Sequence, residues 1–168
     1  SEFEKNRSQL KLTRDRIINK ANISTNDKSR ITVFTNEVVK WRKKIDYYIS
    51  IYLKKSISKL DKRILNVLRI GYYEILFDAK IPIYASVDYW VQFTKIRFGR
   101  KKAGFCNAIL RKARKVKITS NKNFKNLSIF FSYPEWLVQK WENQFGMEQT
   151  IKLLKYFYMQ ILSSVAHM

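Results

Sequence analysis

Apolar residues recur at alternating spacings of three and four between residues 27 and 53, a pattern that places them on one stripe of an α-helix. The stripe contains Ile31, Phe34, Val38, Trp41, Ile45, Tyr48 and Tyr52. The pattern predicts one long helix over residues 27–53 that packs on a core, with Ser24 or Thr25 as its cap. The cations Lys40, Arg42, Lys43 and Lys44 fall off the stripe and are expected in solvent.

Three further helices are predicted between residues 58 and 115. The first, over residues 58–78, contains Gly71 in its interior, which costs about 1 kcal/mol relative to alanine and indicates close approach of a neighbouring helix. Pro82 separates it from the second, because proline suits the first turn of a helix but not its interior. Gly99 ends the second helix, and the third covers residues 101–115. The predicted buried faces contain Leu60, Ile64, Val67 or Leu68, and Ile75, then Ile83, Val87, Trp90, Val91 and Thr94, then Phe105, Cys106, Ala108 and Ile109.

The periodicity stops over residues 116–127, a polar stretch rich in lysine and asparagine that we interpret as a linker. Pro134 then starts another helix, with Leu137 and Trp141 one turn apart on its buried face. Gly146 ends that helix, and a last one is expected over residues 147–162. Ser1–Phe3 and His167–Met168 resemble cloning remnants and do not enter the fold prediction.

The composition favours an all-α protein of one domain with an appendage. The 168 residues include only 4 glycines and 2 prolines, too few for the turns of a β protein. No apolar run reaches the roughly 20 residues of a membrane-spanning helix, and no signal-peptide pattern opens the chain. The single cysteine cannot form an internal disulfide, so we expect a cytoplasmic protein without a membrane partner.

Positive charge is the strongest functional signal. The 34 Lys+Arg against 13 Asp+Glu give a formal net charge of +21, which indicates a polyanionic partner, nucleic acid first. A lysine-rich genome is the alternative explanation, but the charge is also clustered. No acidic residue occurs between Tyr89 and Pro134. Such an unmixed stretch suits phosphate binding, because each neutralised phosphate releases condensed counterions.

The predicted RNA-binding residues come from this acid-free stretch. They are Lys95, Arg97, Arg100, Lys101, Lys102, Arg111, Lys112, Arg114, Lys115 and Lys117, and Lys122 and Lys125 also lie in it. Free amides at the start of the helix after Gly99 would reinforce phosphate binding there. Tyr47, Tyr72, Tyr84 and Tyr89 have no assigned place in the core, so each is a candidate for stacking on an unpaired base, or else a further core residue.

Catalytic and metal chemistry find little support in the sequence. No glycine-rich turn follows a strand, as a nucleotide site would require, and one cysteine with the tail residue His167 cannot make a metal cluster. Cys106 lies on the apolar side of its helix between Phe105 and Ile109, where a buried structural thiol is expected rather than a nucleophile. We therefore expect no active site, no metal and no cofactor in this chain.

Three runs of sequence resemble the NusB-like domain. They are Leu65–Phe77 (LNVLRIGYYEILF), Ile81–Asp88 (IPIYASVD) and Gly99–Arg111 (GRKKAGFCNAILR), in the order and spacing of the family. This domain forms the antitermination factor NusB and the N-terminal region of Sun/Fmu-type ribosomal RNA cytosine-C5 methyltransferases. NusB ends soon after the last run, whereas this chain continues through Ser132–Val138 to Gly146. The continuation is similar to the segment that leads to the catalytic domain in the methyltransferases, which favours that parentage.

The resemblance implies an all-α, NusB-like helical bundle over residues 4–116 that binds RNA. Residues 117–166 would form extra C-terminal linker helices leading toward a methyltransferase domain that is absent from the chain. The implied role is to position small-subunit ribosomal RNA for that catalytic domain, which would be the second partner and would bind S-adenosylmethionine. A stand-alone antitermination or protein-interaction module is the alternative, and a purely structural accessory domain is a third possibility.

Two departures from the family matter. Cys106 stands where the family commonly has valine and matches neither catalytic cysteine of the methyltransferases. Only residues 8–21 precede the helix that contains Trp41, so we expect the family's opening basic helix to be absent or truncated.

Overall fold

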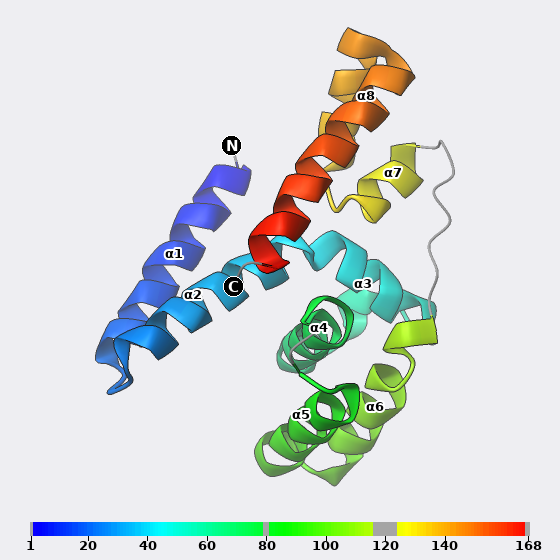
Figure 1. Cartoon of the computed structure of the whole chain (residues 1–168). Helices are drawn as coiled ribbons and strands as arrows, with labels where there is room; N and C mark the ends of the chain where they lie inside the picture. Colours follow the sequence, from blue (N-terminus) through cyan, green and yellow to red (C-terminus); the bar gives the residue numbers. More distant parts are fainter. Residues whose placement is uncertain (1, 79–80, 116–123, 167–168) are drawn as a thin grey trace. The chain divides into compact units, whose positions relative to one another are not determined.

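All regular structure described by the computed structural model is helical (Figure 1). The structure describes residues 2–78, 81–115 and 124–166, and these contain no β-strand, which confirms the all-α prediction. The chain divides into two compact units, Ser1–Val39 and Lys40–Met168. The second unit contains helices on both sides of residue 116, so the two compact units do not divide at that residue. The expected functional boundary at residue 116 stays a prediction.

The first unit is a pair of helices, α1 (Glu2–Lys20) and α2 (Thr25–Lys40). The expectation of an absent or truncated opening helix is wrong, because α1 begins well ahead of residue 8. Ser24 caps α2: its Oγ accepts from the Asp27 N–H at 3.1 Å and donates to the Asp27 carboxylate at 2.7 Å. The local polar pattern thus determines where this helix begins.

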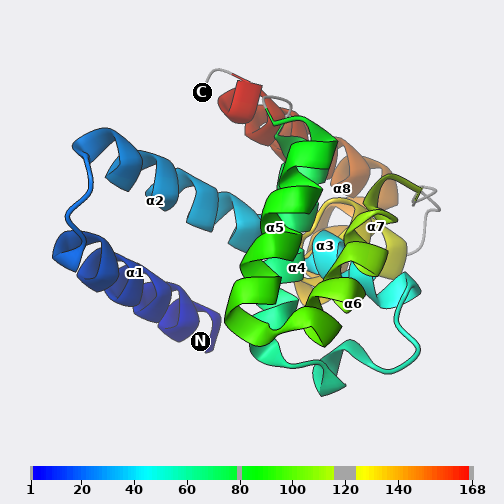
Figure 2. The same cartoon turned by 90° about the horizontal axis from the view of Figure 1, so that it is seen from below.

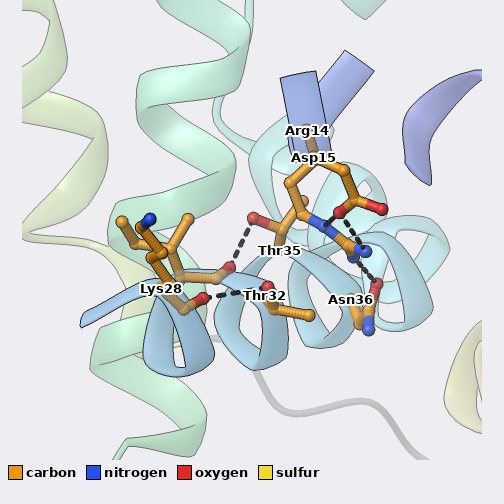
Figure 3. Close-up of polar contacts among 7 residues, drawn as sticks. Arg14, Asp15, Lys28, Thr32, Thr35 and Asn36 are labelled. Carbon is orange, nitrogen blue, oxygen red and sulfur yellow. Dashed lines mark hydrogen bonds and ion pairs between the residues drawn. The ribbon is translucent and has the colours of Figure 1, made fainter. Parts of the chain in front are cut away.

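A side-chain hydrogen bond connects the two helices of the first unit (Figure 3). The Arg14 guanidinium bonds the Asp15 carboxylate at 2.9 and 3.0 Å and donates to Asn36 Oδ1 of α2 at 2.8 Å. The hydroxyls of Thr32 and Thr35 donate to backbone carbonyls one turn earlier, at 2.9 and 2.7 Å. No described residue of α2 is fully buried, so this half of the predicted stripe contacts its neighbours without forming a core.

The prediction of one helix over residues 27–53 is wrong, because the helix breaks at Trp41. The cause is a side chain from far along the sequence. Ser132 Oγ donates to the Lys40 carbonyl at 2.8 Å and accepts from the Lys44 N–H at 3.4 Å. It therefore stands between two groups that an uninterrupted helix would join directly.

The main core of the second unit is a group of helices around α4. The elements are α3 (Arg42–Ile51), α4 (Lys62–Phe77), α5 (Ile83–Phe98) and α6 (Arg100–Leu110), with 3-10 turns η1 (Ile57–Lys59) and η2 (Ala113–Lys115). Helix α4 packs against α3, α5 and α6 (Figure 2). A Cβ on Gly71 of α4 would lie 2.7 Å from a methyl of Leu110, which confirms the expected close approach.

Tyr72 belongs to this core. It is fully buried, and its hydroxyl donates to the Ile109 carbonyl at 3.2 Å. Burial raises the pKa of its phenol. The interpretation of Tyr72 as a surface for base stacking is therefore wrong.

The C-terminal extension consists of α7 (Phe124–Phe130) and α8 (Glu135–Ala166), which lie side by side (Figure 1). Residues 124–127 of the predicted linker are helical, which corrects that prediction, and residues 116–123 lie outside the described residues. Helix α8 kinks at Gly146, whose φ of 75° favours glycine, at the predicted end of a helix. A separate apolar cluster joins the two helices through Leu127, Phe131, Val138 and Leu154.

Lys44 anchors the extension to α3, and its expected place in solvent is wrong. It is 6% exposed, and its Nζ donates to the Tyr158 hydroxyl at 3.3 Å. The ammonium lies 4.6–6.0 Å from the ring centroids of Trp41, Phe77, Phe130 and Tyr158, an arrangement that offsets part of its lost hydration. Burial nevertheless lowers the pKa of Lys44 to about 8.

Candidate nucleic-acid interface

The predicted RNA-binding residues form two groups at opposite ends of the hairpin made by α5 and α6 (Figure 2). Gly99, with φ of 89°, reverses the chain between the two helices. One group lies near Gly99 and the other at the end of α6; they are Lys95, Arg97, Arg100, Lys101 and Lys102, and Arg111, Lys112, Arg114 and Lys115. At about 1.5 Å of rise per residue, Arg100 and Arg111 are about 16 Å apart along α6. Lys117 lies outside the described residues.

The group near Gly99 contains one cation that is already paired. Lys102 Nζ contacts the Asp61 carboxylate at 2.8 Å, and Arg63 bonds the same carboxylate at 3.2 Å. Hydrogen bonds from Arg63 and Lys102 hold the pKa of Asp61 well below its usual range. Lys102 therefore ties the start of α6 to the start of α4, whereas Arg100 and Lys101 are exposed.

The start of α6 offers backbone donors beside these exposed cations. Gly99 is its N-cap, and no side chain caps the helix. The amides of the first turn and the positive end of the helix dipole favour an anion at this position. Arg100 and Lys101 are the cations that would contribute most to phosphate binding here.

The acid-free stretch of sequence is not free of acids in space. Asp61 reaches it from the N-cap of α4, and Asp88 lies on α5 just before the stretch begins. Sequence reasoning missed the pairing with Lys102 because the partner is distant along the chain. An aspartate that precedes an apolar helix is, however, a recognisable N-cap signal.

A groove lies between the start of α5 and the end of α6. Its volume is about 870 Å³, and its lining consists of Ile83, Tyr84, Val87, Asp88, Val91, Asn107, Arg111 and Lys115. Arg111 Nε donates to Asn107 Oδ1 at 3.1 Å, which orients the guanidinium within this lining. The groove arises from two helices packed together, so the periodicity of either helix alone does not reveal it.

The remaining candidate tyrosines and cations differ in their exposure and in their local contacts. Tyr84 is 78% exposed and Tyr89 61% exposed, whereas Tyr47 is 38% exposed. Tyr89 meets the Trp90 ring edge-on, with centroids 5.0 Å apart. Lys112 Nζ lies 5.1 Å from the centroid of the Tyr52 ring, so a local contact already holds this cation.

Metal-binding groups and the cysteine thiol are the other candidates for chemistry among the described residues. The described residues contain no group of three His, Cys, Asp or Glu residues that could hold a metal ion. Cys106 is a free, buried thiol whose pKa is raised by burial, in agreement with the expected structural role. Within the same part of the chain, none of the helices is both long and apolar enough to cross a membrane.

The sequence matches a known protein family. A family model described as the NusB family matches residues 1–115. The chain belongs to the NusB family. The resemblance carried by the three sequence runs is thereby confirmed, and the match includes α1. No solved structure matches the chain.

Relatives of two kinds are similar to this NusB-family chain. Probable ribosomal RNA small subunit methyltransferase B of Bacillus subtilis is 24% identical over 157 residues, covering 91% of this chain and 35% of that protein. The protein of the same name from Synechocystis is 24% identical over 148 residues, which cover 85% of this chain and 33% of that protein. Transcription antitermination protein NusB of Thermotoga petrophila is 44% identical over 68 residues, which cover 39% of this chain and 47% of that protein. The chain thus spans about a third of the methyltransferases that it matches.

Proposed function

We propose that this chain is an RNA-binding domain that positions small-subunit ribosomal RNA for a cytosine-C5 methyltransferase. The supporting observation is the extent of similarity. The Bacillus methyltransferase matches 91% of the chain, and therefore most of the α7–α8 extension, which lies beyond the NusB-family match to residues 1–115. The Thermotoga NusB match covers 39% of the chain.

The extension would connect the RNA-binding core to a catalytic domain in a fixed way. It is joined to α3 through the Lys44–Tyr158 and Lys44–Ser132 hydrogen bonds, so a catalytic domain that followed α8 would continue from a helix that is held against the core. Holding substrate and catalyst in one geometry converts an encounter between two molecules into a reaction within one complex. This chain would contribute binding and orientation, while methyl transfer and S-adenosylmethionine binding would belong to the catalytic domain.

The RNA would be bound mainly through its phosphates. The exposed cations at the two ends of the α5–α6 hairpin offer charge without an evident pattern for reading base edges. Affinity for a fragment of small-subunit ribosomal RNA should therefore fall steeply as salt is raised. A salt titration in which log K hardly changes would contradict phosphate binding.

A pair of charge reversals tests whether the site is local. Arg100→Glu with Lys101→Glu should weaken RNA binding by about tenfold or more, because two contacts become repulsive beside the first turn of α6. Lys54→Glu with Lys55→Glu is the matched control: both lysines are exposed, and the net charge changes equally. Lys102 stays unchanged because it pairs with Asp61. Equal losses from the two double variants would leave only diffuse attraction and overturn the local site.

The second candidate function is a stand-alone antitermination module, favoured by the 44% identity to NusB over 68 residues. Competition between two RNAs of equal length separates the candidates. A small-subunit ribosomal RNA fragment should displace a transcript leader from this chain. Preference for the leader would favour the antitermination role instead.

A further inference from the structure

We propose that the groove between α5 and α6 holds an unpaired base of single-stranded RNA, with the ring of Tyr84 as its stacking surface. This inference rests on the proposed RNA binding and adds the kind of RNA and the place where it is read. The site includes two of the predicted cations that follow α6, Arg111 and Lys115.

The first argument is the exposure of Tyr84 beside an apolar lining. The side chain is 78% exposed, although Ile83, Val87 and Val91 line the same groove. Several buried aromatic rings of this unit pack on other rings, as Trp41 does on Phe77 at 4.7 Å and Tyr73 does on Phe77 at 5.7 Å. An exposed ring next to an apolar groove of about 870 Å³ offers a flat surface and an adjoining space in the size range of ligand sites. A base has a flat π-face of the same kind.

The second argument is the distribution of charge around the groove. Arg111 is the C-cap of α6 and Lys115 ends the following 3-10 turn η2, both residues line the groove, and Asn107 orients the Arg111 guanidinium. Asp88 lies on the α5 side and repels phosphate. A nucleic acid strand would therefore run along the α6 side with its phosphates at Arg111 and Lys115, and its base would point toward Tyr84.

This arrangement selects for unpaired RNA. Bases of an A-form duplex are stacked on one another and present only their edges, whereas bases of loops and single strands can be splayed onto an aromatic side chain. A protein side chain could also enter an apolar groove. The cationic side of this groove and the net charge of +21 favour an anionic strand.

The test measures binding of single-stranded and duplex RNA to three variants by fluorescence anisotropy. The probes are a labelled twenty-nucleotide RNA of mixed, non-self-complementary sequence and the same RNA annealed to its complement. Tyr84→Ala should weaken binding of the single strand by about tenfold and leave duplex binding unchanged. Tyr84→Phe should bind the single strand like the parent, because the ring remains. Tyr89→Ala is the matched control, since Tyr89 is an exposed tyrosine of α5 outside the groove lining.

The outcomes separate this inference from the proposed function. If the parent chain binds neither probe nor ribosomal RNA, the proposed RNA binding fails. If the parent binds RNA but Tyr84→Ala and Tyr89→Ala behave alike, or Tyr84→Ala weakens duplex binding equally, the groove does not hold a base. Crosslinking of a 5-iodouridine decamer to Tyr84 would support the inference independently of affinity, and crosslinking to Tyr89 instead would overturn it.

Discussion

Trp41→Ala probes the core where α3 begins. Trp41 is 1% exposed, stacks on Phe77 with ring centroids 4.7 Å apart, and meets Tyr158 edge-on at 5.4 Å. Truncating a buried tryptophan to alanine costs about 3–5 kcal/mol. The substitution also removes two aromatic pairs, worth about 0.5–1.5 kcal/mol each. It removes the cation–π contact between the Trp41 ring and the Lys44 ammonium as well. We therefore expect a loss of about 5 kcal/mol, at the upper end of the range.

Denaturant unfolding followed by far-UV circular dichroism measures this loss. Thermal melts should show the same ranking, with Tm lowered by about 10–20 °C for a chain of this size. Trp136→Ala is the control, because Trp136 is 63% exposed and its truncation should change stability by no more than about 0.5 kcal/mol. Equal losses from the two tryptophans would show that the assignment of the core at α3 is wrong.

Three further outcomes are expected. Burial lowers the pKa of Lys44 from 10.5 to about 8. Below pH 8 the buried ammonium reduces the free energy of unfolding by its whole cost, and this loss of stability disappears as the pH rises toward 10.5. Denaturant melts should show the parent gaining up to about 3 kcal/mol relative to Lys44→Met over this window, and a difference independent of pH would contradict the burial. Gly71→Ala places a methyl 2.7 Å from Leu110 and should destabilise the fold by about 1–3 kcal/mol in the same melts, although alanine favours helix; unchanged stability would mean that Leu110 can move away. Titration calorimetry should detect no S-adenosylmethionine binding to this chain, and specific binding would refute its assignment as a non-catalytic region.

Local signals in the sequence predicted much of the second unit. Pro82 and Gly99 separate α4, α5 and α6 close to the expected positions, because both residues act on the backbone where they stand. Gly146 ends a helical segment for the same reason. The break at Trp41 was not predictable in this way, since the hydroxyl that causes it comes from Ser132.

The candidate site was predictable in composition but not in geometry. The cations at Arg100 and Lys101 are exposed as expected, yet Lys102 pairs with Asp61, which lies outside the acid-free stretch. Lys44 lies off the stripe that faces α4, but α7 and α8 add a second apolar surface that covers it. Helical periodicity reports one buried face at a time, so a residue covered from another direction escapes it.

The position of Ser132 affects the order in which the chain folds during its synthesis. A protein emerges from the ribosome from its N-terminus, so the segment that becomes α2 and α3 is complete long before residue 132 is made. Until then nothing separates the Lys40 carbonyl from the Lys44 amide, and a single continuous helix can form through Trp41. The helix break at Trp41 is therefore completed only after the C-terminal extension has been made.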